Sequence, residues 1–230
     1  MTIEFIDSPS PNFDARGVNI DLVVLHYTGM KSGRAALDRL TDAAAKVSSH
    51  YLVEEDGRIF RLVEEEKRAW HAGVSSWRGA SDVNARSVGI EIVNPGHEWG
   101  YRAFPGAQID AVIELVRDIQ SRWGIPRHGV VGHSDVAPER KEDPGELFPW
   151  EQLSQAGVAI GRFDGAPDPG IDHTEALTAI RDVGYYFPDG AHAAAVLAFQ
   201  RRFCPSALGQ GLNPVTKAAA LWARRVTGGG

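Results

Sequence analysis

Three residues with side chains suited to acid–base or metal chemistry stand in short apolar runs typical of buried strands. His26 follows LVVL, Glu91 interrupts an apolar run as VGIEIV, and His133 follows GVVG. A charged group or an imidazole in a buried strand costs free energy unless it is paired or binds a metal. Because open α/β sheets place their sites at the carboxyl ends of strands, these side chains converge if their strands are neighbours.

The loop after His133 supplies two more charged groups. Lys141 and Asp143 are separated by one residue, and positions i and i+2 of an extended segment point the same way. Pro144 biases Asp143 toward an extended conformation, so an ammonium and a carboxylate can face one site. Two imidazoles and one carboxylate, from His26, His133 and Asp143, make a three-ligand zinc set with a fourth position open.

The residue types alone leave other interpretations open. The candidate ligands are scattered along the chain without a compact HExxH motif, and six further histidines offer competing trios. A histidine at a strand end more often forms an ordinary hydrogen bond, Glu91 can be half of an ion pair, and Asp143 before a proline is a common turn residue. Spacing therefore suggests a metal site without selecting its members.

The segments that must position these residues alternate between strand and helix patterns. Residues 22–28, residues 87–93 and the sequence GVVGH are typical of buried strands, and Asp56-Gly57 between two strand-like runs indicates a hairpin. Apolar residues at helical spacing predict helices over residues 33–46, 107–123 and 150–156. Strands interleaved with helices predict an α/β fold for residues 1–160, with a mixed central sheet flanked by helices.

A second, smaller unit follows. The stretch 161–170, GRFDGAPDPG, is rich in Gly, Pro and Asp and is predicted to be a linker. Beyond it, 171–227 predicts a small all-helical domain. Its expected helices cover residues 173–183, 190–203 and 214–226. Residues 171–230 carry six Lys or Arg and four Asp or Glu, whereas the whole chain has a net charge of −6.

Composition excludes several classes of protein. A chain of 230 residues with 43% hydrophobic and 23% charged residues fits one large or two modest globular domains. A net charge of −6 gives no basic surface for nucleic acid, and no apolar run is long enough for a transmembrane segment. No signal peptide is visible, which favours the cytoplasm, or the periplasm or envelope if a leader was removed. Cys204 is a single cysteine, and no oligomeric state is indicated.

Five motifs, in order, resemble the zinc-dependent N-acetylmuramoyl-L-alanine amidases. They are LVVLHYT, VSSHYLVEEDGRIFRLV, AWHAG, NARSVGIEIVN and GHSDVAPERKEDPG, spread over residues 15–156. This family, amidase type 2, contains the AmpD- and AmiD-like enzymes and is related to phage amidases and peptidoglycan recognition proteins. The resemblance implies the amidase type 2 fold, one zinc ion per chain, and a peptidoglycan or muropeptide substrate cut between muramic acid and L-alanine.

The resemblance also implies roles for individual residues. His26, His133 and Asp143 match the family's zinc ligands, Glu91 matches the acid beside the metal-bound water, and Lys141 matches the lysine that faces the reacting carbonyl. In chemical terms, Glu91 would carry a proton from water to the leaving nitrogen, which is worth roughly 10²–10⁴-fold in rate. Lys141 would stabilise the oxyanion.

The same resemblance places substrate contacts and gives the helical unit a role. His71 in AWHAG, Trp77 and Asn84 fall where the family contacts the muropeptide. Within the helical unit, AAAVLAFQRRF and GLNPVTKAAALW are similar to peptidoglycan-binding domains. The alternative for this unit is a plain three-helix core that serves in dimerisation or as a cap.

Two other functions compete with the amidase. A recognition protein would bind peptidoglycan without cutting it, although such proteins have lost a zinc ligand and this chain has all three. A zinc peptidase would apply the same chemistry to a peptide bond within the stem. A serine hydrolase or a nucleotide enzyme is disfavoured, because GxSxG, P-loop and GxGxxG motifs are absent from the sequence.

Overall fold

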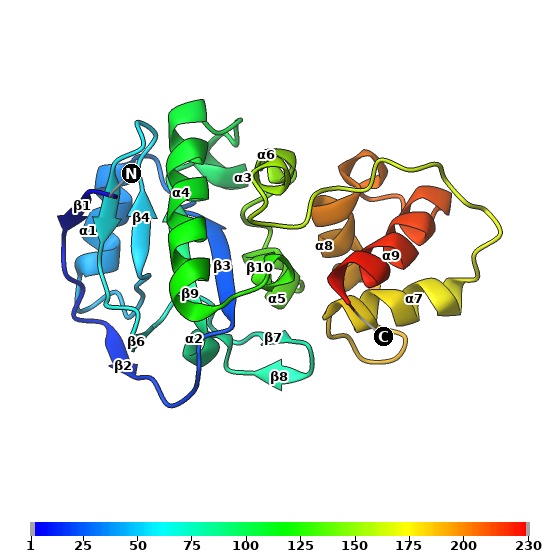
Figure 1. Cartoon of the computed structure of the whole chain (residues 1–230), viewed down its shortest axis with the longest axis horizontal. Coiled ribbons are helices and arrows are strands. Elements are labelled where there is room, and N and C mark those ends of the chain that lie inside the picture. Colours follow the sequence, from blue (N-terminus) through cyan, green and yellow to red (C-terminus); the bar gives the residue numbers. More distant parts are fainter. Residues whose placement is uncertain (1–2, 229–230) are drawn as a thin grey trace.

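A six-stranded mixed sheet forms the centre of the larger part of the molecule (Figure 1). The computed structural model describes residues 3–228. Across the sheet the strands are β1 (Phe5–Asp7), β5 (Ile59–Arg61), β4 (Tyr51–Val53), β9 (Ser87–Ile92), β3 (Leu22–Tyr27) and β10 (Val130–Gly132). Within this sheet, β4 and β5 are the one antiparallel pair of neighbours, and the predicted hairpin joins them. The other neighbouring strands of the sheet run parallel. Two short ribbons pair β2 (Phe13–Ala15) with β6 (Lys67–Ala69) and β7 (Ser76–Trp77) with β8 (Ala80–Ser81).

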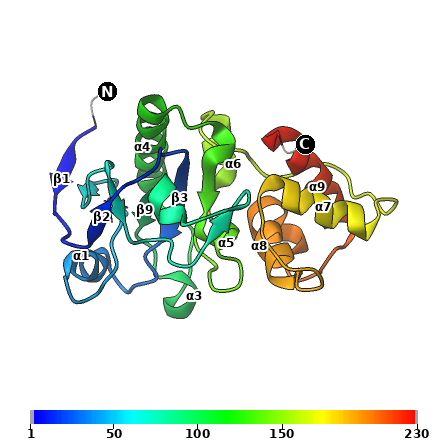
Figure 2. The same cartoon turned by 90° about the horizontal axis from the view of Figure 1, so that it is seen from below.

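Helices cover the sheet and build the C-terminal part of the chain. In chain order they are α1 (Gly33–Thr41), α2 (Val83–Arg86), α3 (Gly96–Trp99), α4 (Gly106–Trp123), α5 (His133–Val136), α6 (Trp150–Gln155), α7 (His173–Val183), α8 (Ala193–Phe203) and α9 (Pro214–Thr227), with 3₁₀ turns at Arg127–Gly129 and Pro205–Ala207. In Figure 2, α4 lies on one side of the sheet and α1 on the other. The predicted α/β class with a mixed sheet and a helical C-terminal part is confirmed.

Alternation along β3 explains how the layers pack. Val23 and Leu25 share a buried cluster with the apolar stripe of α4. Leu22 and Val24 point to the opposite face, where they join a cluster that includes residues of α7, α8 and α9. Because side chains alternate along a strand, His26 is the next residue on the Leu22–Val24 face. The candidate ligand therefore lies on the side of the sheet away from α4.

Local hydrogen bonds end one predicted helix early. The apolar pattern predicts a helix over 33–46, but α1 ends at Thr41. Asp42 is extended, its side chain accepts a hydrogen bond from the N–H of Ala44 (2.9 Å), and Nδ2 of Asn12 donates to its carbonyl oxygen (2.8 Å). A side chain that bonds to the nearby backbone competes with the helix, and here it prevails over the periodic pattern.

Three helices form the C-terminal part, here named the helical module (residues 171–227). α7 has the predicted bounds, and α9 ends one residue later than predicted. α8 begins at Ala193 instead of residue 190, because it is preceded by a turn in which the N–H of Ala191 donates to the carbonyl of Pro188 (3.1 Å). Residues 161–170, the predicted linker, contain no helix or strand.

The sheet and the helical module share one apolar cluster. Val24 of β3 and Val131 of β10 belong to the same buried cluster as Ile180 of α7 and Phe199 of α8. The two parts are thus packed against each other, as both views show (Figures 1 and 2). Among the described residues, no helix combines the length and the apolar character that crossing a membrane requires.

Candidate metal centre and active site

His26 and Glu91 are direct neighbours in the central sheet. β3 and β9 run parallel, with Leu22 opposite Ser87 and His26 opposite Glu91. Since paired residues of neighbouring strands point to the same face, both side chains emerge at the carboxyl end of the sheet, on the face away from α4. The polar residues that interrupt two apolar strands are therefore brought together by the strand register.

His133 arrives from the next strand. It is the first residue of α5, directly after β10, which corrects the expectation that it ends the strand. The absence of a side chain at Gly132 permits the close approach of the following loop, since a Cβ there would lie 2.7 Å from Cδ of Pro144. The N–H of Ser134 then donates to the carbonyl oxygen of Asp143 (2.8 Å). These contacts bring Asp143 back to His133.

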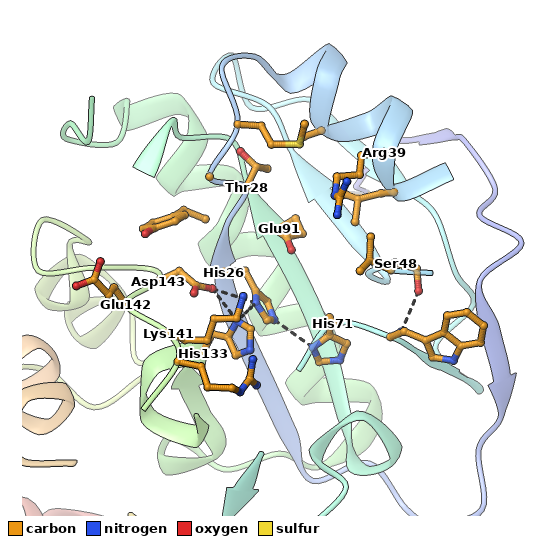
Figure 3. Close-up of a pocket in the computed structure, with 18 residues that line it drawn as sticks. His26, Thr28, Arg39, Ser48, His71, Glu91, His133, Lys141, Glu142 and Asp143 are labelled. Carbon is orange, nitrogen blue, oxygen red and sulfur yellow. Dashed lines mark hydrogen bonds and ion pairs between the residues drawn. The ribbon is translucent and has the colours of Figure 1, made fainter. Parts of the chain in front are cut away.

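Three buried donor atoms converge on one point (Figure 3). Nδ1 of His26 lies 2.9 Å from Nδ1 of His133 and 3.1 Å from Oδ2 of Asp143. Nδ1 of His133 lies 2.9 Å from the same oxygen. Tetrahedral zinc with bonds of about 2.0–2.1 Å separates its ligand atoms by roughly 3.3 Å, so these atoms need to part by only a few tenths of an ångström. The donor set fits zinc in type, number and spacing.

Hydrogen bonds on the far side of each imidazole fix which nitrogen faces this point. Nε2–H of His133 donates to the carbonyl of Ala72 (3.2 Å), and Nε2–H of His26 donates to Nδ1 of His71 (3.0 Å). Nε2–H of His71 in turn donates to Oγ of Ser87 (3.2 Å). The protons are assigned from this network. Both ligand rings are thereby left with an Nδ1 lone pair for a metal, held in place by partners behind them.

Charge at the centre also suits a cation. Burial, together with the neighbouring His133, lowers the pKa of His26 to about 4, so the ring is neutral at pH 7. Burial would raise the pKa of Asp143, but the two histidines hold it well below its usual value and keep the carboxylate ionised. A neutral imidazole and an ionised carboxylate are the protonation states that metal binding requires.

The pKa of Glu91 is shifted in the opposite direction to that of Asp143. Burial, with Asp143 nearby, raises its pKa to about 8, and Lys141 opposes the shift. Its Oε2 is buried and has no hydrogen-bond partner among the described residues. A buried polar atom without a partner is uncommon, and this one belongs to a residue that lines the same cavity as the three candidate ligands. Its pKa matches a group that takes up and releases a proton near neutral pH.

A cavity of about 390 Å³ opens above the donors. Glu91, Lys141 and His71 line it together with the three candidate ligands, so the structure brings six of the eight predicted site residues to one cavity. Figure 3 shows Lys141 beside the donors. A positive group at the mouth of a site with a deep metal position is suited to stabilising a developing oxyanion.

The predicted substrate contacts are only partly supported. His71 lines the cavity, but both of its ring nitrogens are engaged, with His26 and Ser87. Trp77 is 3% exposed, lies outside the cavity lining and packs edge-on against Tyr185 of the helical module. The predicted contact of Trp77 with substrate stays a prediction.

Asn84 is also placed outside the cavity lining. It is 5% exposed, and its Oδ1 accepts hydrogen bonds from the N–H groups of His71 (3.1 Å) and Ala72 (2.7 Å). Asn84 therefore fixes the AWHAG turn that presents His71. Its predicted contact with substrate stays a prediction.

Sequence reasoning missed part of the cavity wall. Arg39 of α1, Ser48 and Trp70 also line it. Figure 3 shows Arg39 and Ser48 on the side away from Lys141. Trp70 stands directly before His71 in AWHAG, so the motif carried a signal for it. Arg39 gave none, because an arginine on the polar face of an amphipathic helix is ordinary.

The mixed sheet presents two imidazoles and a carboxylate to one point beside a buried glutamic acid, an arrangement that can hold a metal ion. A sequence profile described as N-acetylmuramoyl-L-alanine amidase matches residues 16–146. The chain is 38% identical over 229 residues to the N-acetylmuramoyl-L-alanine amidase AmiD of Escherichia coli, covering 87% of this chain and 81% of the relative. It is 33% identical over 163 residues to the 1,6-anhydro-N-acetylmuramyl-L-alanine amidase AmpD of Haemophilus influenzae, covering 62% and 86%.

Solved structures agree. AmiD from E. coli, in complex with the substrate anhydro-N-acetylmuramic acid-L-Ala-D-γ-Glu-L-Lys, superposes with a TM-score of 0.83 at 34% identity and covers 94% of both chains. AmpDh3 from Pseudomonas aeruginosa, in complex with anhydromuramic pentapeptide, gives 0.80 at 33% identity over 93% of this chain and 94% of that one. The chain belongs to the N-acetylmuramoyl-L-alanine amidase family.

Proposed function

We propose that this protein uses one zinc ion per chain to hydrolyse the amide bond between N-acetylmuramic acid and L-alanine in peptidoglycan or muropeptides. The observation that carries the proposal is the convergence of His26, His133 and Asp143 beside the unpartnered carboxyl group of Glu91. The relatives are named for this bond, and two of them were solved with anhydromuramic peptides.

Each residue of the cavity has a task in this reaction. His26, His133 and Asp143 would hold the zinc ion, which would lower the pKa of a water molecule toward about 7 and polarise a carbonyl group. Glu91 takes a proton from the water molecule while the oxygen of the water bonds to the lactyl carbonyl carbon. Glu91 then delivers that proton to the alanine nitrogen as the C–N bond breaks. Lys141 stabilises the negative charge on the carbonyl oxygen. The products are a lactyl carboxylate and a peptide with a free amino group.

Product masses test the proposal. The protein is incubated with purified sacculi and with anhydromuramyl tripeptide, with and without a chelator. The expected products are intact stem peptides and peptide-free sugar, formed only when metal is present. Cleavage inside the stem would instead identify a peptidase. Binding of wall material without turnover, by zinc-loaded protein, would identify a recognition protein.

We also propose that the helical module binds the wall polymer. A cavity of about 440 Å³ on the module, lined by α8 and the loop before α9, supports this role. Leu197 and Gln200 of α8 and the imidazoles of His173 and His192 line it, which combines apolar surface with hydrogen-bonding groups. Such a mixture suits sugars and short peptides.

Binding to sacculi tests this second proposal. In a Glu91→Gln background, which prevents digestion, Leu197→Glu is expected to reduce the bound fraction severalfold. Val226→Glu is the matched control, because Val226 is a similarly exposed aliphatic residue of the module that does not line this cavity (40% against 37% exposed). Equal binding by the two variants would assign the module a packing role only.

A further inference from the structure

Helix α8 of the helical module contacts the segment that carries three of the five proposed catalytic and metal-binding residues. Residues 133–146 contain His133, Lys141 and Asp143, and α5 at the start of this segment packs against α8. The segment leaves the sheet after Gly132 and returns at Asp143. The positions of the donors therefore depend on what holds this segment at its two ends.

The first end is held through Asp135, which is 2% exposed. Its Oδ2 accepts a hydrogen bond from the N–H of Gly132 (2.7 Å), which fixes the start of α5. Its Oδ1 accepts one from the hydroxyl of Tyr185 in the helical module (2.6 Å), and Nε of Arg202 lies 3.9 Å from the carboxylate. A buried carboxylate needs such partners, and here two of them come from the module.

The second end is held through Arg201, whose side chain is only 7% exposed. Its Nη2 lies 3.2 Å from Oε1 of Glu142, and its Nε lies 3.4 Å from Oε2 of Glu146. Glu142 stands between Lys141 and Asp143. A buried guanidinium is tolerated when it is paired, so Arg201 ties these two carboxylates, and with them the loop, to α8.

We propose that Arg201 is a positioning residue of the metal centre. By pairing with Glu142 and Glu146, it holds the loop at the place where Asp143 meets the two histidines and Lys141 faces the cavity. Glu142 is 51% exposed, so solvent screens its ion pair with Arg201, and we assign the pair an effect on the conformation of the loop. For its activity readout alone, the inference rests on the proposed amidase function.

The test compares Arg201→Met, which keeps the apolar stem, with Arg201→Lys, which keeps the charge. Arg225→Met is the matched control, because Arg225 is an exposed arginine of the same module without an ion pair among the described residues. Zinc affinity is measured by competition with a chromophoric chelator, and the cobalt-substituted proteins are compared by visible absorption. Turnover of anhydromuramyl tripeptide is measured at saturating zinc.

Arg201→Met is expected to weaken zinc binding by about 10-fold, as loss of a partner behind a metal site does, and to weaken the tetrahedral cobalt bands. It is expected to lower kcat by a similar factor with little change in KM, and Arg201→Lys to recover part of both losses. Zinc affinity and kcat within twofold of the Arg225→Met control would overturn the inference. Weaker zinc binding in a protein whose wild type never cleaves the substrate would uphold it and refute the proposed function instead.

Discussion

The ionisation of Glu91 is expected to make the stability of the metal-free protein depend on pH. Its pKa in the folded protein, raised by burial to about 8 from 4.5, means that the folded state keeps a proton that the unfolded chain releases between these values. The stability of the metal-free protein therefore falls as pH rises through this window. Glu91→Gln cannot ionise, so we expect it to exceed the metal-free wild type in stability by roughly 1–4 kcal/mol at about pH 9 and to match it near pH 4.

Urea unfolding of the two chelator-treated proteins at both pH values measures this difference. A Glu91→Gln effect of the same size at both values would show that the substitution acts through packing. The result would then remove the buried, protonated carboxyl group from the account of the site.

Lys141 is expected to act on the reaction and not on the metal. Lys141→Ala removes a charge at the cavity mouth, and we expect kcat to fall by about 10²–10³-fold, as for other oxyanion-stabilising groups. Bound zinc, measured by elemental analysis, is expected to stay near one ion per chain. Lys141→Arg, which keeps the charge, serves as the control. Loss of zinc from the alanine variant would contradict the assigned role.

His71 has two proposed roles: the sequence motif predicts a contact with substrate, and the structure shows a hydrogen bond with His26. The structure engages its Nδ1 with the ligand His26, so His71→Ala is expected to weaken zinc binding by about 10–100-fold with KM unchanged at saturating zinc. Zinc competition and steady-state kinetics measure both quantities. A raised KM with normal zinc affinity would favour the substrate contact predicted from the motif.

At the scale of elements, the long or strongly patterned segments were predictable. The apolar stripe of α4, the Asp-Gly hairpin between β4 and β5, and the buried runs of β3 and β9 all follow from local patterns. The short strands β1, β2, β6, β7 and β8 were not predicted, because two or three residues carry no periodicity and their pairing depends on partners distant in the chain.

Gly89 of β9 lies at a position where only glycine leaves room for a neighbouring side chain. A Cβ at Gly89 would lie 2.5 Å from Cγ of His71, so the imidazole of His71 packs against the strand only because residue 89 has no side chain. Gly89→Ala is expected to lower the free energy of unfolding by about 1–3 kcal/mol and to weaken zinc binding, since His71 must move. Gly106→Ala, at the start of α4 with open space around it, is the control.

Urea unfolding and zinc competition check the Gly89→Ala variant. A loss of stability without any change in zinc affinity would show that His71 can shift without disturbing His26. In that case the packing of His71 against Gly89 would have no effect on the candidate metal site.

For the whole molecule, the motifs predicted the centre of the site better than its surroundings. His26, Glu91 and His133 interrupt or end apolar runs, which marks them before any fold is known, and the structure brings them together with Lys141 and Asp143. Trp77 and Asn84 lie in equally clear motifs, but tertiary packing uses them as supports. A motif fixes where a residue stands in the chain, whereas contacts with other segments decide what its side chain does.

The contacts of the helical module were also beyond local prediction. Its helices follow from the sequence, yet the pairing of Tyr185 with Asp135 and of Arg201 with Glu142 joins residues 50 or more positions apart. The AmpD structure in the comparisons matches 68% of this chain and 99% of its own, so about a third of the present chain has no counterpart there.

Restoring metal to the depleted protein tests whether hydrolysis depends on one zinc ion per chain. Chelator-treated protein is titrated with zinc while the release of L-alanine-terminated peptide is followed, and His133→Ala is titrated in parallel. Activity of the wild type is expected to be absent at the start and to rise linearly to a plateau at one equivalent per chain, whereas the variant stays inactive. Full activity in wild-type protein shown by elemental analysis to be free of metal would contradict the account.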